Sequence, residues 1–319
     1  MTGSGLILID KPAGITSHDV VARVRKAAGT RKVGHAGTLD PMATGLLILG
    51  INSSTRLLTY IVGADKEYLA TIRLGAASTT DDAEGELLAP ASQEALDAVT
   101  AEAIAAGIAE LTGEIEQVPS SVSAIKVDGK RAYARVRAGE KVELKPRAVT
   151  VSEFELLETR REPGAIDLEV RVVCSSGTYI RSLARDLGAG LGVGAGLGAG
   201  GAAGVGGHLT ALRRTRVGAY GVRDAHDLAT LDAEAALIPA VVAAGRLFET
   251  IELTEQQAID LTHGRRIHLA DREGPGGEPV AAIAPTGALV GLIEFRGKEA
   301  RTLVNFPTDE AVGQAGGRG

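Results

Sequence analysis

The segment from Gly34 to Gly45 concentrates residues that could do chemistry. It reads Gly-His-Ala-Gly-Thr-Leu-Asp-Pro-Met-Ala-Thr-Gly and places Asp40 directly before Pro41. Asp-Pro is common at turns, because proline pushes its neighbour toward extended backbone and aspartate can hydrogen-bond its own chain. On a glycine-rich loop beside a buried strand, however, desolvation and a nearby cation would set the protonation state of this carboxylate. The residues alone leave Asp40 open between a turn residue and a catalytic carboxylate.

A second candidate lies in the segment Cys-Ser-Ser-Gly-Thr-Tyr-Ile-Arg, which ends at Arg181. The pattern predicts a strand end, a glycine turn and a helix whose first turn bears Tyr179 and Arg181. An arginine fork can hold a carboxylate bidentately, keep it ionised and fix its direction. We therefore expect Arg181 to pair with Asp40, with a purely structural ion pair as the alternative.

The charge of the chain is segregated. The formal net charge is −6, which argues against a generic nucleic-acid binder, because phosphate contacts need clustered cations. The stretch from Lys126 to Arg147 nevertheless holds eight basic residues against three acidic ones, including Lys130 and Arg131, and a second basic cluster occupies 213–216. Segregation of this kind indicates an RNA-facing surface. A solvated basic hairpin explains the charge equally well.

Composition excludes several classes of protein. With 45% hydrophobic and 3% aromatic residues, the chain can bury a core that must be aliphatic. The single cysteine rules out an internal disulfide framework and suits a reducing cytosol. The six histidines lack close metal-ligand spacing, and we expect neither metal nor cofactor. No signal peptide or membrane span is evident. The sequence thus predicts a cytoplasmic protein that does not associate with membranes, and we expect a monomer.

Hydrophobic periodicity predicts an α+β fold with a mainly antiparallel mixed sheet flanked by helices. We expect strands at 5–10, 46–50, 67–74, 149–157 and 166–174 and helices at 17–28, 56–62, 91–112 and 179–187, the first capped by Ser17. The Gly/Ala-rich segment 188–207 follows a helix rather than a strand, so it predicts a flexible loop rather than a dinucleotide-binding turn. A small β-rich second domain is expected over 239–319, with a capped helix at 254–264 and strands at 280–284, 289–295 and 302–306.

Six separated motifs resemble, in their order, those of the TruB family of tRNA pseudouridine synthases. The Asp40 segment resembles the catalytic motif of that family. The others are Leu-Ile-Asp-Lys-Pro-x-Gly-x-Thr-Ser at 8–17, Asp-Lys-Glu-Tyr at 65–68, Val-Pro at 118–119 with Ser-Ala-Ile-Lys-Val-Asp-Gly-Lys-Arg-Ala-Tyr at 123–133, the Arg181 segment, and His-Leu-x-x-Leu-Arg-Arg-Thr at 208–215. The resemblance extends from Gly5 to about Asp227.

The resemblance implies a role for each matched residue. Asp40 matches the essential aspartate and Arg181 the arginine that pairs with it, while Tyr68 matches the tyrosine that stacks on the flipped base. By the same resemblance, Lys11 supports the active-site loop and Tyr179 lies in the pocket. His35 packs among displaced nucleotides, and Asp82 lies on the RNA side of the cleft. A thumb-like RNA-binding insertion is expected at 117–148, and it contains Lys126, Lys130 and Arg131. Residues 1–238 form the catalytic domain (a pseudouridine synthase fold), and 239–319 is similar to the small PUA-type domain.

The function that the resemblance implies is isomerisation of uridine to pseudouridine at position 55 in the T-loop of tRNA. The base would be extruded from its stack, at a cost of a few kcal/mol that stacking on an aromatic face offsets. The implied partner is tRNA, contacted through its T-arm and through its acceptor stem by the C-terminal domain. A guide-RNA-dependent pseudouridine synthase and a tRNA-folding chaperone, in which binding dominates, are the alternatives.

Overall fold

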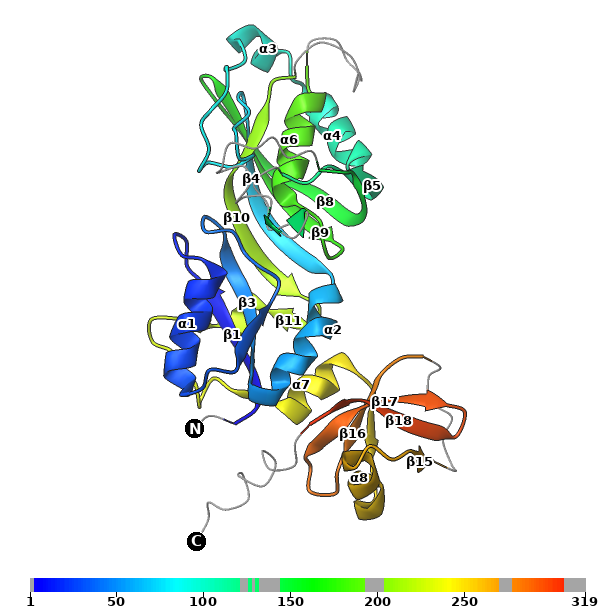
Figure 1. The fold of residues 1–319 in the computed structure, drawn as a ribbon. Coiled ribbons are helices and arrows are strands. Elements are labelled where there is room, and N and C mark those ends of the chain that lie inside the picture. Colours follow the sequence, from blue (N-terminus) through cyan, green and yellow to red (C-terminus); the bar gives the residue numbers. More distant parts are fainter. Residues whose placement is uncertain are drawn as a thin grey trace. The chain divides into compact units, whose positions relative to one another are not determined.

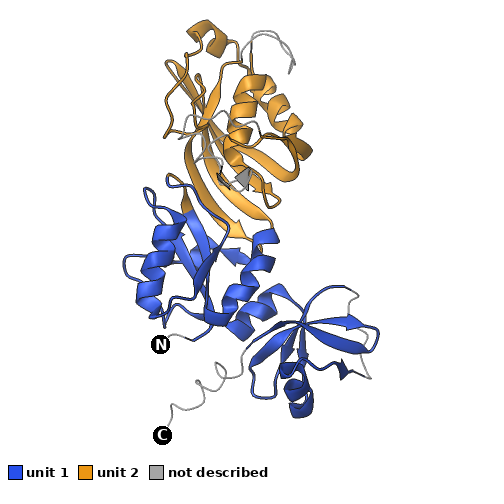
Figure 2. Cartoon of the chain, viewed as in Figure 1, with its two compact units in different colours: residues 1–41, 45–63, 219–319 blue, residues 42–44, 64–218 orange. Residues whose placement is uncertain are grey.

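The computed structural model describes residues 3–120, 144–192, 204–269 and 277–306, and of residues 126, 127, 130 and 131 the backbone alone. The chain falls into two compact units (Figure 2). Unit 1 comprises residues 1–41, 45–63 and 219–319, and unit 2 comprises residues 42–44 and 64–218. Among the described residues, no helix is both long and apolar enough to span a membrane.

Unit 1 is built on short strands around β1 (Gly5–Lys11). β1 pairs antiparallel with β3 (Thr44–Ile51) and with β13 (Ile238–Pro239), and parallel with β12 (His226–Asp227). β2 (Val33–Ala36) lies antiparallel to β3. Helix α1 (Ser17–Ala28) packs on these strands (Figure 1), and together they bury an aliphatic core that includes Ile7, Ile9, Val20, Val24, Leu47 and Leu49.

The ends of α1 follow from its sequence. A capping box closes the N-terminus, because Thr16 Oγ1 accepts from Asp19 N while Asp19 accepts from Thr16 N. Gly29, at φ +63°, supplies the left-handed C-cap. The prediction of Ser17 as the N-cap was wrong by one residue, since the Ser17 side chain is buried and bonds another loop.

The remaining elements of unit 1 lie at its C-terminal end and after β3. A 3-10 turn, η1 (Asn52–Leu57), leads into α2 (Leu58–Gly63), and the predicted helix at 56–62 begins in η1 and continues through α2. β11 (Tyr220–Gly221), η2 (Val222–Asp224) and α7 (Ala240–Leu247) follow in the last part of the chain. The expected β-rich C-terminal segment is confirmed as a sheet of five strands, in the order β14 (Thr250–Glu252), β16 (Val280–Ile283), β17 (Leu289–Arg296), β18 (Glu299–Asn305) and β15 (Ile267–His268). Helix α8 (Glu255–Thr262) begins at a Thr254–Gln257 capping box, as its sequence predicts.

Unit 2 is an antiparallel sheet with helices packed on it. The strand order is β10 (Gly207–Val217), β4 (Lys66–Leu74), β9 (Ala165–Cys174), β8 (Arg147–Glu162) and β5 (Gly113–Gln117). Helices α4 (Ala101–Glu110) and α6 (Ile180–Gly190) pack against one another and against the sheet (Figure 1), and α3 (Gln93–Asp97) precedes them. Residues of β4 alternate: even-numbered side chains from Lys66 to Leu74 are buried, and odd-numbered ones point to the other face.

The α+β prediction is confirmed, and every predicted strand is present within a few residues. The strand β10 was missed, because its Arg-Arg-Thr-Arg sequence lacks the apolar alternation of a half-buried strand. Of the Gly/Ala-rich segment at 188–207, residues 193–203 lie outside the described residues. Most of the insertion predicted at 117–148 also lies outside them, although β6 (Lys126–Val127) and β7 (Lys130–Arg131) form an antiparallel pair. The side chains of Lys126, Lys130 and Arg131 are not described.

Candidate active site

Two backbone anchors hold the loop that carries Asp40. The chain turns at Gly37, which has φ +83°. Just before Asp40, Ser17 Oγ accepts from Leu39 N at 2.9 Å and donates to Leu39 O at 3.1 Å. Just after it, Pro41 O accepts from Gly14 N at 2.8 Å. The half-buried Asp40 is therefore held from both sides by its neighbours, so its backbone position is fixed within unit 1.

Lys11 is a fully buried cation beneath this loop. Its side chain is 0% exposed, and its ammonium donates to the carbonyl oxygens of Pro12 at 2.9 Å, Ile15 at 2.8 Å and Pro41 at 3.2 Å. An ammonium has three donors, and these three bonds tie the turn after β1 to the residue that follows Asp40. This is the geometry that the predicted loop-supporting role of Lys11 requires.

His35 lies on β2 and is half-buried. Its ring meets the ring of His18 edge to face, with the centroids 5.8 Å apart. The pair joins the strand that leads to the Asp40 loop to the first turn of α1. The predicted contact of His35 with nucleotides stays a prediction.

Arg181 pairs with Asp82 within unit 2. Both side chains are almost fully buried, at 6% and 2% exposed, and Arg181 Nη1 lies 3.3 Å from Asp82 Oδ2. The same nitrogen donates to Thr80 O at 3.0 Å. Asp82 Oδ1 in turn accepts from Glu84 N at 3.1 Å and from the Thr80 hydroxyl. Sequence reasoning assigned Asp82 to the RNA side and missed this pair, whose only signal is that a buried arginine requires an acid.

A second pair lies one helical turn further along α6. Arg185 Nη1 is 3.3 Å from Asp81 Oδ2, and Arg185 Nη2 donates to Val118 O at 2.7 Å. Asp81 has φ +62°, an uncommon backbone conformation for a residue other than glycine. Burial raises the pKa of the Asp81 carboxyl, and the Arg185 charge opposes that shift. Adjacent aspartates thus meet arginines four residues apart on one face of α6, an arrangement that sequence reasoning did not find.

Tyr179 is the N-cap residue of α6, and Gln117 holds its backbone. Tyr179 N donates to Gln117 Oε1 at 2.8 Å, and Gln117 Nε2 donates to Tyr179 O at 3.0 Å. The helix has no side-chain cap of its own, so the 2%-exposed Gln117 takes that place. Because Arg181 is the second residue of α6, this contact helps to fix the backbone position from which the Arg181 side chain extends.

Tyr68 lies on the buried face of β4, with 9% of its surface exposed. Its cross-strand neighbour on β10 is Arg214, which is 1% exposed, and Lys66 precedes it on the same face. Burial lowers the pKa of Lys66, and the charge of Arg214 lowers it further. The predicted stacking residue therefore stands beside two buried cations that sequence reasoning did not single out, although the Leu-Arg-Arg-Thr motif contained one of them.

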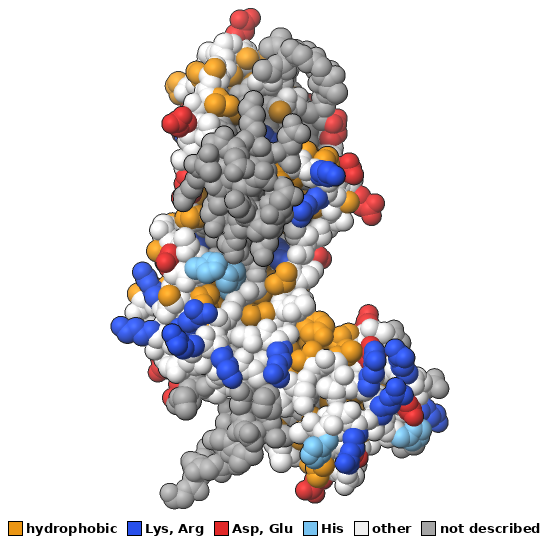
Figure 3. Space-filling view, viewed as in Figure 1, with side chains coloured by type: hydrophobic (Ala, Val, Ile, Leu, Met, Phe, Trp, Pro, Cys, Tyr) orange, Lys and Arg blue, Asp and Glu red, His pale blue; other side chains and the backbone are white. Residues whose placement is uncertain are grey.

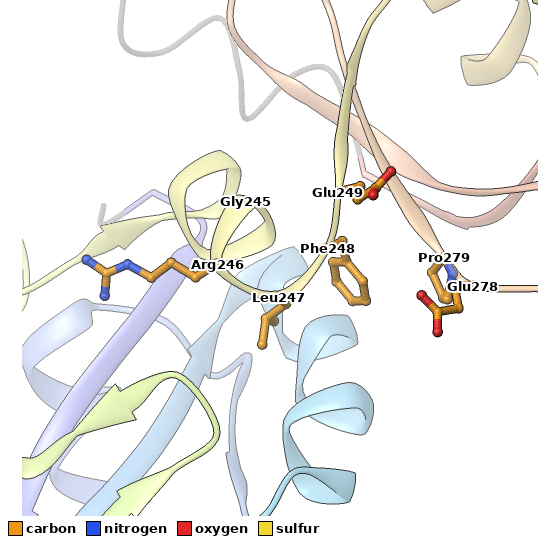
Figure 4. A pocket seen from close by; sticks show the side chains of 7 residues that line it. All are labelled: Gly245, Arg246, Leu247, Phe248, Glu249, Glu278 and Pro279. Atoms are coloured by element: carbon orange, nitrogen blue, oxygen red, sulfur yellow. The ribbon is translucent and has the colours of Figure 1, made fainter. Parts of the chain in front are cut away.

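The protein surface has a cavity in each unit. One of about 310 Å³ in unit 2 adjoins the end of the Asp40 motif, with Met42, Thr44, Leu69, Thr71, Glu169 and Arg213 in its lining. The other, of about 540 Å³ in unit 1, is lined by residues 245–249, Glu278 and Pro279. Figure 4 shows Arg246 extending away from Phe248, Glu249 and Glu278, and its guanidinium lies over the Tyr220 ring at 5.7 Å. This second cavity holds none of the predicted site residues.

Comparison with known proteins finds two family models that match this chain. Residues 25–180 match the family described as "TruB family pseudouridylate synthase (N terminal domain)", and residues 248–307 match "tRNA Pseudouridine synthase II, C terminal". A protein of Leifsonia xyli named tRNA pseudouridine synthase B is 76% identical over 97% of this chain and 99% of its own length. One of the same name from Arthrobacter is 53% identical over 98% of this chain and 99% of its own.

Solved structures agree on the fold. A crystal structure of a Cbf5-Nop10-Gar1 complex contains a chain that superimposes with a TM-score of 0.68 at 26% identity, covering 96% of this chain and 86% of that one. The α+β sheet with its β-rich C-terminal segment, and the anchored Asp40 loop, define a protein of the pseudouridine synthase class. The chain belongs to the TruB family of pseudouridylate synthases.

Proposed function

We propose that this protein isomerises uridine to pseudouridine in tRNA, at position 55 in the T-loop, with Asp40 as the catalytic carboxylate. The names of the relatives supply the reaction and the substrate class. The observation that carries the assignment of Asp40 is the double anchoring of its loop, by Ser17 on one side and by Lys11 and Gly14 on the other. A catalytic group has to be held close to its productive geometry by rigid supports.

In the proposed reaction the bond from uracil N1 to ribose C1′ breaks and a bond from C5 to C1′ forms. The C5 proton leaves and N1 gains a proton, so the reaction needs no redox partner. An ionised carboxylate beside the ribose stabilises charge that develops when the base detaches, or adds to the sugar directly. We propose that Arg181 keeps Asp40 ionised through a charge-assisted hydrogen bond, while Asp82 and Thr80 O orient the guanidinium.

Tyr68 is proposed to stack on the flipped base, and Tyr179 and His35 to line the site. Extrusion of a base from its stack costs a few kcal/mol, which an aromatic platform offsets. Lys66 and Arg214 lie on the face of the sheet that carries Tyr68. The thumb-like insertion at 117–148 and the C-terminal domain are proposed to contact the T-arm and the acceptor stem.

A direct experiment incubates the protein alone with an unmodified tRNA transcript and maps pseudouridine chemically, comparing the wild type with Asp40→Ala. We expect pseudouridine at position 55 with the wild type and none with the variant, which should still bind tRNA. No modification by the wild type in the absence of a guide RNA would contradict the proposed function. Equal modification by both proteins would contradict the role of Asp40, whereas tRNA refolding without any modification would favour a chaperone.

A further inference from the structure

The outer side of α1 and the turn after it carry a group of basic residues. Arg23 and Lys26 lie three residues apart, and therefore on one side of the helix. Arg31 and Lys32 follow in the turn that precedes β2. All four side chains are exposed, and Figure 3 shows Lys and Arg side chains gathered on the part of unit 1 that carries α1. We call these four residues the α1 basic face.

The four cations of the α1 basic face are not paired with any acid that the structure describes. No ion pair joins any of its four residues to an acid within the described part of the chain. Exposed or half-buried arginines elsewhere do have acidic partners: Arg73, Arg160, Arg171, Arg265, Arg266, Arg296 and Arg301. Other exposed cations, such as Arg56, Arg223 and Lys298, also have no ion pair within the described residues. On the α1 basic face, however, four such cations lie within ten residues of sequence, in a chain with more acidic than basic residues, 40 against 34.

The one acid of α1 is already engaged. Asp19 accepts from Thr16 N at 2.8 Å and from Thr16 Oγ1 at 2.6 Å. These two bonds are the main cause of the lowered pKa of its carboxyl, and the charge of Arg23 lowers it further by a smaller amount. It therefore serves the capping box at the start of the helix, one turn before Arg23. The potential around Arg23 and Lys26 stays positive, and an extended polyanion is the ligand that such a surface favours.

The position of the face fits an RNA strand whose target nucleotide lies at Asp40. Ser17 touches the Asp40 loop at the first turn of α1. With a rise of about 1.5 Å per residue, Arg23 and Lys26 lie about 9 and 14 Å further along the helix axis. Double-stranded DNA rises about 3.4 Å per nucleotide of one strand, and we take a rise of this order for the RNA strand. The face is thus about three to four nucleotides from the loop along the strand.

We propose that the α1 basic face binds the phosphate backbone of the tRNA substrate, a few nucleotides from the isomerised uridine. It is a binding surface separate from the thumb-like insertion and from the C-terminal domain. The identity of the RNA rests on the proposed function. The face supplies affinity and orientation and takes no part in bond making, because backbone contacts fix the register of a nucleic acid on its protein.

The test compares two double variants that each remove two positive charges. R23Q/K26Q removes unpaired cations of the face, and R160Q/R171Q removes cations of unit 2 that are each 2.6 Å from a glutamate. The affinity for an unmodified tRNA transcript is measured from 50 to 200 mM salt, together with the single-turnover rate at saturating enzyme. For R23Q/K26Q we expect roughly tenfold weaker binding and a salt slope of log Kd that is smaller by about 1.5, since each lost phosphate contact lowers the slope by roughly 0.7–0.9. The saturated rate should not change.

R160Q/R171Q should retain the affinity and the salt slope of the wild type. Unchanged binding by R23Q/K26Q, or an equal loss in both double variants, would overturn the proposal. So would a loss of binding to vesicles of anionic lipid without any effect on tRNA, which would assign the face to a membrane surface. The binding measurement does not depend on catalysis, so a failure of the proposed isomerisation would be recognised separately, from the wild-type reaction.

Discussion

At the scale of residues, the site depends on charged groups that are buried and fully partnered. Lys11 meets three carbonyls, and Arg181 meets a carboxylate and a carbonyl. Removal of one member of such a set leaves the others unpaired in a region with little water, and that is more costly than the loss of the bond itself. Substitutions at these positions should therefore act through geometry as well as through charge.

Arg181→Lys should lose most of the turnover and keep the binding of tRNA. A lysine can meet Asp82 as a point charge but cannot reproduce the planar fork that reaches several acceptors at once. We expect the single-turnover rate to fall about 100-fold, as when one oriented donor is removed from an active site. Arg185→Lys is the matched control, because Arg185 pairs with Asp81 one turn along the same helix. Turnover by Arg181→Lys equal to that of Arg185→Lys would refute the proposed role.

Lys11→Met should destabilise unit 1 and slow the reaction. The methionine side chain fills the space of the lysine stem as far as Cε, but it leaves the carbonyls of Pro12, Ile15 and Pro41 without their donor. Unsatisfied buried acceptors cost about 1–3 kcal/mol, so the free energy of unfolding measured in urea should fall by roughly that amount. The exposed Lys298 offers a control, since Lys298→Met should leave both stability and rate unchanged. A Lys11→Met protein with wild-type rate would show that the anchor is not needed.

At the scale of elements, the sequence predicted the strands that carry the site better than the tertiary contacts between them. Apolar periodicity located β1, β3, β4, β8 and β9, and the motifs located Asp40 and Arg181, because those signals are local. The pairing of Arg181 with Asp82 and the contact of Gln117 with Tyr179 were not predicted. They join residues that are far apart in the chain (62 positions between Gln117 and Tyr179), and no short-range pattern records which buried polar groups will meet.

Gln117 is expected to affect the reaction rate by stabilising the first turn of α6. Gln117→Ala removes both bonds to the Tyr179 backbone, each worth about 1 kcal/mol. The first turn of α6 should then fray, so that hydrogen exchange at Ile180 and Arg181 accelerates and the single-turnover rate falls, while tRNA affinity changes little. Gln117→Glu keeps the acceptor for Tyr179 N but places an oxygen against Tyr179 O, so it should not restore the rate.

Gln93→Ala is the matched control for Gln117→Ala. Gln93 also makes two hydrogen bonds, to Asp97 at 2.8 Å and from Gly164 N at 3.0 Å, but it is exposed and lies on α3. Its removal should leave exchange in α6 and the rate unchanged. If Gln117→Ala gave faster exchange in α6 with an unaltered rate, the helix start would not position Arg181 for the reaction.

At the scale of the whole molecule, each unit contains a buried group whose deprotonation under alkaline conditions is suppressed. In unit 2, burial raises the pKa of the Cys174 thiol from 9.0 to about 11. In unit 1, burial raises the pKa of Tyr220 from 10.0 to about 12, and its hydroxyl donates to Ala243 O at 3.2 Å. Both groups are neutral in the folded protein at neutral pH. Their ionisation under alkaline conditions should therefore affect the free energy of unfolding, through one group in each unit.

The stability of the folded protein should therefore fall as the pH rises above 9. Between pH 9 and 11 the unfolded chain loses the Cys174 proton while the folded chain keeps it, and ionisation then favours the unfolded state. A shift of two pKa units corresponds to roughly 3 kcal/mol, all of it present below pH 9. Tyr220 adds a loss of the same sign between pH 10 and 12.

Urea unfolding of the wild type, Cys174→Ala and Tyr220→Phe at pH 8, 9, 10 and 11 separates the two contributions. Cys174→Ala lowers the free energy of unfolding at every pH, because it leaves a cavity, so the slope against pH is the informative quantity. That slope should be flatter than in the wild type from pH 9 to 11, whereas Tyr220→Phe should flatten it only above pH 10. Identical slopes in all three proteins would mean that both groups ionise as readily in the folded chain as in the unfolded one, and that neither interior is as closed to hydroxide as its burial implies.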